Sequence, residues 1–229
     1  MKKRVLMLVC TLGLMAGAEV WYVPGWLRCH APGSDTMAAV QDCFPGSRPV
    51  YCDWDGNGLW GMSVTNAERR VAGLVAEIEG LDASVRTNLT LVGHSLGGRI
   101  VVRALARLSE KGIVVRRGVV LAAAMPRDDA DIAKCGVASR EPVLFLSNPK
   151  DVTLRCFYRM APGIHGAALG LAGPLASPPN SLSIVVPSWT PAETDVKALW
   201  GRIDLFKKVA AHHAIFYLEH LKKVVKEEN

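Results

Sequence analysis

Short apolar runs alternate with amphipathic segments along most of this chain. Near-continuous apolar runs of this length are typical of parallel strands buried on both faces. They predict six strands, at residues 19–23, 48–52, 88–93, 118–124, 142–147 and 182–186.

The segments between these runs carry the periodicity of helices. Residues Thr65 to Glu68 form a capping-box pattern, which indicates a helix N-terminus at Thr65. The segment after residue 95 places Ile100, Ala104 and Leu108 on one face and Arg99, Arg103 and Arg107 on another. An arginine row can bind an anion, but the pattern favours a solvated helix face. Residues 215–225 form a C-terminal amphipathic helix.

Strand–helix–strand alternation predicts an α/β fold with a mainly parallel sheet of six strands and helices on both faces. Right-handed crossovers then bring the carboxyl ends of all strands to one edge. The chain has 229 residues, of which 50% are hydrophobic and 21% charged, and this composition fits one globular domain. We assign that domain to residues 19–229.

The N-terminus has the features of a bacterial-type signal peptide. Residues 1–18 contain Lys2, Lys3 and Arg4, an apolar run and Ala16-Gly17-Ala18, an A-x-A cleavage site. The run is too short to span a bilayer comfortably. We therefore expect an exported protein, periplasmic or secreted, that begins at Glu19. The alternative is a buried N-terminal strand at residues 4–10 in a cytoplasmic protein.

The net charge bears on which partners the protein can bind, and the cysteine content bears on its disulfides. The net charge is +6, and it falls to +3 without residues 1–18, which hold three basic residues and no acid. The remaining basic residues are mixed with acidic ones, so we expect no nucleic-acid partner. Export would permit disulfides among the five cysteines beyond residue 18, with one left over and the pairing open.

The third predicted strand leads directly into Gly93-His94-Ser95-Leu96-Gly97, a G-x-S-x-G motif, and a helix follows without a spacer. This strand–turn–helix context is what the motif requires to lift a serine hydroxyl above a sheet. A serine hydroxyl is a poor nucleophile until a base takes its proton. A base and an acid that orients it are therefore expected at neighbouring strand ends.

Asp151 follows the fifth strand and is the favoured acid, with Asp128, Asp129 and Asp131 as rivals. Asp can also simply form a turn at such a position. His212 and His213 follow the sixth strand, so the chain has the order Ser, Asp, His. His30 and His165 lie in predicted loops and stay alternatives.

With these residues the chain resembles the α/β-hydrolase family, in particular its small lipase- and esterase-like members. The resemblance covers residues 19–229 in layout, and its specific part is the LVGHSLGG segment. It implies an ester-cleaving serine hydrolase with Ser95 as nucleophile, Asp151 as orienting acid and His213 as base. The family's spacing between its histidine and a following aromatic residue favours His213 over His212.

The resemblance also implies an oxyanion hole formed by the backbone N–H groups of Trp26 and Leu96. Pro24-Gly25-Trp26 stands where the family has His-Gly. No HExxH or paired-cysteine spacing is present, so we expect no metal and no cofactor.

The sequence leaves alternatives open for the activity and for the role of residues 161–181. The same triad could serve an acyltransferase, thioesterase or amidase, and the fold could belong to a non-catalytic binding protein. The Gly- and Pro-rich residues 161–181 could form a flap over the site or a plain surface loop. We expect a small acyl ester as substrate, and the acyl length and oligomeric state stay open.

Overall fold

The structure is a computed structural model that describes residues 17–27, 34–160, 166–186 and 214–227. Its sheet has six strands, all parallel, in the order β2-β1-β3-β4-β5-β6. The strands are β1 (Glu19–Val23), β2 (Arg48–Tyr51), β3 (Thr90–His94), β4 (Arg117–Leu121), β5 (Val143–Ser147) and β6 (Ser181–Val185). Each of the six predicted apolar runs overlaps one of them.

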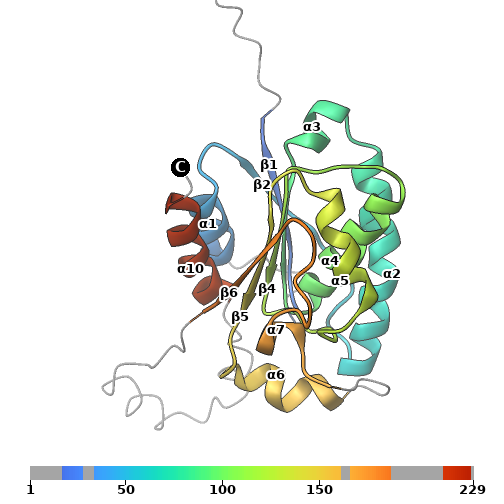
Figure 1. Ribbon diagram of the computed structural model, residues 1–229, viewed down its shortest axis with the longest axis vertical. Helices are drawn as coiled ribbons and strands as arrows, with labels where there is room; N and C mark the ends of the chain where they lie inside the picture. Colours follow the sequence, from blue (N-terminus) through green and yellow to red (C-terminus); the bar gives the residue numbers. More distant parts are fainter. Residues whose placement is uncertain (1–16, 28–33, 161–165, 187–213, 228–229) are drawn as a thin grey trace, which may run out of the picture.

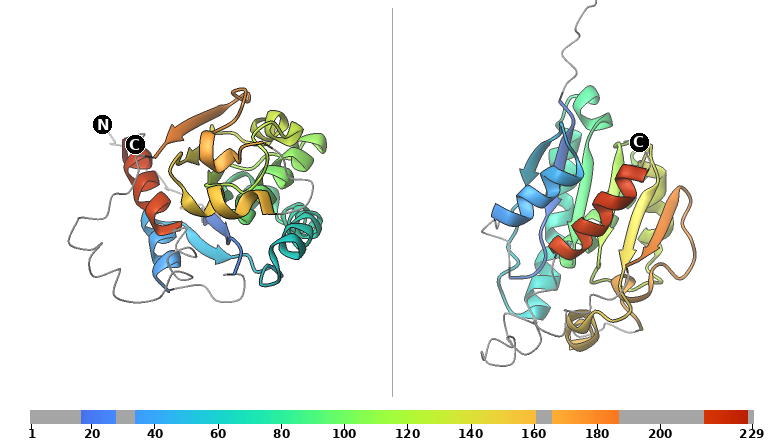
Figure 2. Two further views of the ribbon diagram at one scale, coloured as in Figure 1. Left: turned by 90° about the horizontal axis from the view of Figure 1, so that it is seen from below. Right: turned by 90° about the vertical axis from the view of Figure 1, so that its left-hand side faces the viewer.

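Helices lie on both faces of the sheet. One layer consists of α1 (Ser34–Cys43) and α10 (Ala214–Glu227), and the other of α2 (Trp60–Glu79), α4 (Leu96–Glu110) and α5 (Ala130–Cys135) (Figure 1). Figure 2 shows α1 and α10 side by side in front of the sheet. The short elements are α3 (Ala83–Thr87), η1 (Gly136–Ala138), α6 (Val152–Phe157), η2 (Tyr158–Met160) and α7 (Leu169–Ala172). The predicted α/β architecture is confirmed.

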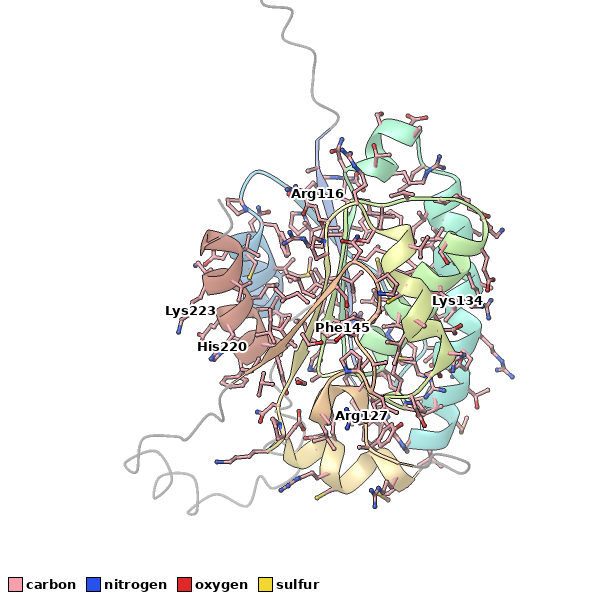
Figure 3. All side chains as sticks on the ribbon, viewed as in Figure 1. Arg116, Arg127, Lys134, Phe145, His220 and Lys223 are labelled. Carbon is pink, nitrogen blue, oxygen red and sulfur yellow. The ribbon has the colours of Figure 1, made fainter. Side chains whose placement is uncertain are left out.

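The core lies between the central strands and these two layers. Phe145 on β5 is 1% exposed and lies in this interior (Figure 3). The edge strands differ from the prediction that all six are buried on both faces. Leu182 and Val185 on β6 are exposed, and β2 has no fully buried residue. The two helical layers centre on the inner strands, so burial decreases toward the edges.

Helix α2 begins earlier than the capping-box pattern indicated. Its N-cap is Leu59, and Thr65 lies inside the helix, where its hydroxyl donates to the Gly61 carbonyl at 3.2 Å. Such a bond to the fourth preceding residue is common for threonine within helices. The Ser63 hydroxyl contacts the Gly56 carbonyl at 3.1 Å, so the first turn is fixed by the loop before it.

The arginine row on α4 is mostly not a solvated face. Arg99 is buried and pairs with Glu68 of α2, whereas Arg103 is half-buried and only Arg107 is exposed. Arg103 contacts Glu68 as well and reaches Asp129 at 2.9 Å and Asp131 at 3.5 Å. We call Glu68, Arg99, Arg103, Asp129 and Asp131 the α4 network. It joins α2, α4 and α5 on one face of the sheet.

The segment that contains α7 packs against the carboxyl ends of the strands. Leu169 donates its N–H to the Met125 carbonyl at 2.8 Å, Gly170 to Ala123 at 2.9 Å, and Asn148 to Gly170 at 2.8 Å. Figure 3 shows Arg127 beside α7 at this edge. The described part of residues 161–181 is therefore tied to the ends of β4 and β5.

The described cysteines are free thiols, so no disulfide joins Cys43 and Cys52. Burial raises the pKa of the Cys43 thiol to about 11 and the pKa values of Cys52 and Cys135 to about 12. Within the described residues, no helix is long and apolar enough to cross a membrane.

Candidate active site

Ser95 stands at the turn between β3 and α4, at the carboxyl edge of the sheet. Its backbone has φ 55° and ψ −117°, in the left-handed region that a non-glycine residue rarely adopts. Such a conformation costs about 1–3 kcal/mol and persists only where the surroundings enforce it. The turn is held by Ser95 N–H donating to the Leu121 carbonyl at 2.9 Å and Ala124 N–H donating to the Ser95 carbonyl at 3.0 Å.

A close approach between α4 and β1 explains why the turn needs glycine. A Cβ at Gly97 would lie 2.0 Å from the Val23 carbonyl oxygen, a distance that no side chain can accept. The start of α4 therefore packs directly on the end of β1. Leu96, the first residue of this helix, is fully buried beside Ser95. First-turn N–H groups have no carbonyl partner inside their own helix, which suits the donor role predicted for Leu96.

The loop after β1 meets Ser95 from the other side. A Cβ at Gly25 would lie 2.9 Å from the Ser95 Cβ, so this glycine allows the loop backbone to reach the serine. Trp26, the other predicted oxyanion donor, comes next in the chain. The structure thus brings the predicted residues Ser95, Leu96 and Trp26 to one end of the sheet.

This loop is held by residues 54–58. The Trp54 indole N–H donates to the Pro24 carbonyl at 2.9 Å, and the Trp26 indole N–H donates to the Gly58 carbonyl at 2.8 Å. Leu27 has φ 61°, and its N–H donates to Gly56 at 3.2 Å. The Trp26 and Trp60 rings pack edge to face, with centroids 5.3 Å apart. The position of the Trp26 backbone is consequently set by hydrogen bonds and ring packing.

Asp151 lies at the end of the turn after β5 and is 8% exposed. It caps α6, because its Oδ1 accepts the Leu154 N–H at 3.0 Å. Its Oδ2 accepts the hydroxyl of Tyr217 on α10 at 2.9 Å. A carboxylate has about four acceptor positions, so two hydrogen bonds leave capacity for another donor.

The rival aspartates have other surroundings. Asp129 caps α5 by accepting the Asp131 N–H at 3.0 Å, and both side chains contact Arg103 in the α4 network. Asp128 is exposed. Among the four aspartates proposed from the sequence, only Asp151 is buried at a strand end without an ion pair to Arg103.

The predicted base, His213, lies outside the described residues, as do His212, His165 and His30. Two histidines are described. His94 is buried, and its ring centroid is 6.2 Å from that of Tyr217. His220 contacts the Phe216 carbonyl at 2.9 Å and lies on the side of α10 that faces away from the sheet (Figure 3). The described residues therefore include Ser95 and Asp151, the predicted nucleophile and acid, and the predicted base lies outside them.

Two contributors to the site were missed in the sequence. They are Tyr217, which contacts Asp151, and Trp54, which contacts the loop that carries Trp26. The contacts of both join residues far apart in the chain, 66 positions for Tyr217 and Asp151 and 30 for Trp54 and Pro24. Within the described residues, no group of three or more His, Cys, Asp or Glu side chains is arranged to hold a metal ion.

Comparison with known proteins identifies the family to which this protein belongs. The sequence matches the alpha/beta hydrolase family over residues 13–218, and the chain therefore belongs to this family. The sheet of parallel strands with a strained serine turn after β3 agrees with that membership.

Solved structures of similar fold include esterases and a thioesterase. Est1E from Butyrivibrio proteoclasticus, solved with ferulic acid, is 15% identical with a TM-score of 0.51, and the match covers 92% of this chain and 89% of Est1E. Esterase PE8 is 15% identical, with a TM-score of 0.45 and coverage of 85% and 94%. YbtT, the type II thioesterase of the yersiniabactin pathway, is 13% identical, with a TM-score of 0.44 and coverage of 87% and 95%. None of the curated protein sequences matches this one significantly. At these identities the likeness shows the fold alone.

Proposed function

We propose that this protein is a serine hydrolase that cleaves carboxylic esters through an acyl-enzyme intermediate. The observation that carries the proposal is the strained backbone of Ser95 at the buried end of β3. A fold that maintains a costly conformation at a serine favours a reactive role for that serine. Asp151, buried and held by two hydrogen bonds on its two oxygens, supports the role of an acid that orients a base.

The proposed reaction has two halves. The Ser95 hydroxyl attacks the ester carbonyl carbon and gives its proton to the base, which we assign to His213. The carbonyl electron pair moves to oxygen, and the backbone N–H groups of Trp26 and Leu96 stabilise the resulting oxyanion. The carbon–oxygen bond to the alcohol then breaks, and the departing oxygen takes the proton from His213. A water molecule cleaves the acyl-enzyme in the same way and releases the acid.

Labelling by a fluorophosphonate probe tests the proposal, since only an activated serine reacts rapidly with this reagent. We expect a single labelled peptide that contains Ser95, and turnover of 4-nitrophenyl acetate by the unlabelled protein. Ser95→Ala should remove both, a loss of at least about 10⁴-fold. A folded wild-type protein that neither labels nor turns over ester would instead indicate a binding protein.

The assignment of the base is tested by separate substitutions. We expect His213→Ala to abolish labelling and His212→Ala to retain most of it. The reverse result would move the role to His212. If both variants remain active, His165 or His30 becomes the candidate.

We further propose that residues 1–18 are a signal peptide and that the protein is exported. Mass spectrometry of protein recovered from an exporting bacterial host should show Glu19 at the N-terminus. A protein that retains Met1 would contradict this.

A further inference from the structure

The hydroxyl of Tyr217 donates a hydrogen bond of 2.9 Å to the Oδ2 of Asp151, and both residues are buried. We infer that Tyr217 is a positioning residue: it fixes the Asp151 carboxylate in the orientation from which that carboxylate directs the catalytic base. The inference rests on the proposed function, because it assigns Tyr217 a role in the same triad.

The two hydrogen bonds on Asp151 come from different elements. Oδ1 accepts the Leu154 N–H of α6, and Oδ2 accepts the Tyr217 hydroxyl of α10. One bond alone would let the carboxylate turn about its terminal torsion, which has a broad energy well. Donors on both oxygens fix the plane of the carboxylate.

The Tyr217 hydroxyl keeps its proton at every pH near neutrality, so it can donate a hydrogen bond throughout that pH range. Burial raises the pKa of its hydroxyl far above the ordinary value, and the charge of Asp151 and the hydrogen bond to it raise it further. A side-chain hydrogen bond with Asn148 acts in the opposite direction. The Tyr217 hydroxyl gives its single hydrogen to Asp151, so the amide group of Asn148 is the donor in the bond between Asn148 and Tyr217. Asn148 thus donates to Tyr217, and Tyr217 donates to Asp151.

Other described titratable groups near Tyr217 lie on β3, α1 and α10 and in the turn after β5. His94 at the end of β3 has its ring centroid 6.2 Å from that of Tyr217. Cys43 at the end of α1 contacts the Leu218 carbonyl, and burial raises the pKa of this thiol to about 11. Lys150 precedes Asp151 and is exposed, and His220 lies one turn farther along α10. Asp151 is therefore the one carboxylate that the described structure places against this hydroxyl.

Tyr217 lies close in the sequence to the proposed base. Helix α10 begins at Ala214, so Tyr217 lies within its first turn, about 4.5 Å along the axis from the first residue. His213 directly precedes this helix in the sequence. The Tyr217–Asp151 bond therefore fastens the segment that follows the proposed base to the strand end that carries the proposed acid.

Tyr217→Phe tests the inference, with Tyr158→Phe as its matched control. Tyr158 is equally buried, but its hydroxyl has no hydrogen-bond partner among the described residues. The readout is the rate constant for fluorophosphonate labelling of Ser95 as a function of pH, which needs no knowledge of the substrate. Near-ultraviolet circular dichroism establishes that each variant is folded.

For Tyr217→Phe we expect a fall in the plateau labelling rate of about tenfold, the size expected when a hydrogen bond to a charged group is lost. We also expect the acid limb of the profile to move to higher pH. A carboxylate that has lost one donor attracts the protonated base more strongly, so the base gives up its proton at a higher pH. Tyr158→Phe should leave the plateau and the midpoint unchanged.

A double-mutant cycle with Asp151→Asn establishes whether Tyr217 acts through Asp151. In the Asp151→Asn background, Tyr217→Phe should have no further effect on the slow residual labelling. An undiminished tenfold effect there would overturn the inference and indicate an action through His94 or through packing. If Tyr217→Phe does not fold, 3-fluorotyrosine at position 217 replaces it. This residue is a stronger donor of similar size, and it should move the acid limb to lower pH.

The outcomes separate this inference from the proposed function. If wild type labels at Ser95 while Tyr217→Phe and Tyr158→Phe both match it at every pH, the role of Tyr217 is wrong and the hydrolase proposal stands. A lower plateau rate in Tyr217→Phe with an unmoved acid limb would also contradict the role of Tyr217, since lost packing alone would then explain the slower labelling. If wild type does not label at all, the proposed function itself fails.

Discussion

Two groups of polar side chains lie one helical turn apart, one at the turn that precedes α4 and one on α4 itself, and their carboxylates are held in different ways. Arg99 starts the α4 network, in which Arg103 alone contacts three carboxylates, those of Glu68, Asp129 and Asp131. Ser95, four residues earlier, belongs to the candidate site, where Asp151 accepts hydrogen bonds from Leu154 N–H and the Tyr217 hydroxyl. These two donors carry no charge.

The difference shows two ways to hold a carboxylate in place, by ion pairs and by hydrogen bonds from neutral donors. In the α4 network, two arginines pair with three carboxylates, and these ion pairs fix the packing of α2 against α4 and of α4 against α5. At Asp151, the Leu154 N–H and the Tyr217 hydroxyl orient the ionised form without cancelling its charge, because both donors are neutral. Ion pairing therefore marks the structural region, and orientation by neutral donors marks the region proposed for chemistry.

The largest expected effect contrasts one aspartate from each region. Asp151→Asn should lower the rate of Ser95 labelling by about 10⁴-fold, because the neutral amide cannot stabilise the protonated base and favours its wrong tautomer. Asp129→Asn removes a carboxylate from the α4 network and should change the labelling rate less than about threefold. Labelling rates under identical conditions decide the comparison, and equal losses in the two variants would refute it.

The next effect concerns stability. Glu68→Gln should lower the free energy of unfolding by about 2 kcal/mol, because the buried Arg99 guanidinium loses its carboxylate partner. Chemical denaturation measures this change, and labelling of Ser95 should be unaffected.

Glu77→Gln on the same helix is the matched control. Glu77 pairs with Arg70 at 2.8 Å but is 49% exposed, and such surface pairs contribute less than about 1 kcal/mol. If both variants lose the same stability, the α4 network is no more than a set of surface ion pairs.

The smallest effect concerns the loop beside Ser95. Trp54→Phe removes the indole N–H that donates to the Pro24 carbonyl, and the loop that carries the proposed donor Trp26 loses one anchor. We expect kcat for 4-nitrophenyl acetate to fall about tenfold with little change in KM, because the oxyanion forms only in the transition state.

Trp60→Phe provides the comparison for that substitution. The Trp60 indole N–H has no hydrogen-bond partner among the described residues, so its loss should leave kcat within about twofold of wild type. A larger loss in Trp60→Phe than in Trp54→Phe would show that ring packing, and not the bond to Pro24, holds the loop.

Much of the fold could be predicted because buried parallel strands leave a strong sequence signal. Runs such as GVVLAAA and PVLFLS are typical of buried parallel strands. Their order along the chain determines which residues lie at the edge of the sheet where the strands end. The edge strand β6 shows the limit of this signal. Its apolar run resembles the inner ones, yet Leu182 and Val185 are exposed, because a strand's place in the sheet depends on its neighbours.

Local polar patterns were less informative. The capping-box pattern at Thr65 is real, but a helix that begins at Trp60 places it in an interior turn. The arginine row looked like a solvated face because Glu68 and Asp129, its partners, lie 31 and 26 residues away in the sequence from Arg99 and Arg103. The motif around Ser95 was recognisable because it consists of five consecutive residues. The Tyr217–Asp151 bond was not, because it depends on how α10 packs against the sheet.

The backbone conformation of Ser95 also limits how this site can evolve. At φ 55° a β-branched residue is a severe outlier, because its second γ substituent collides with the backbone, whereas an unbranched side chain is tolerated at moderate cost. Threonine is a single-nucleotide neighbour of serine and keeps the hydroxyl, yet this turn excludes it. Cysteine has the shape that the turn admits. The lineage of this protein can therefore exchange oxygen for sulfur at the position more readily than it can add one methyl group.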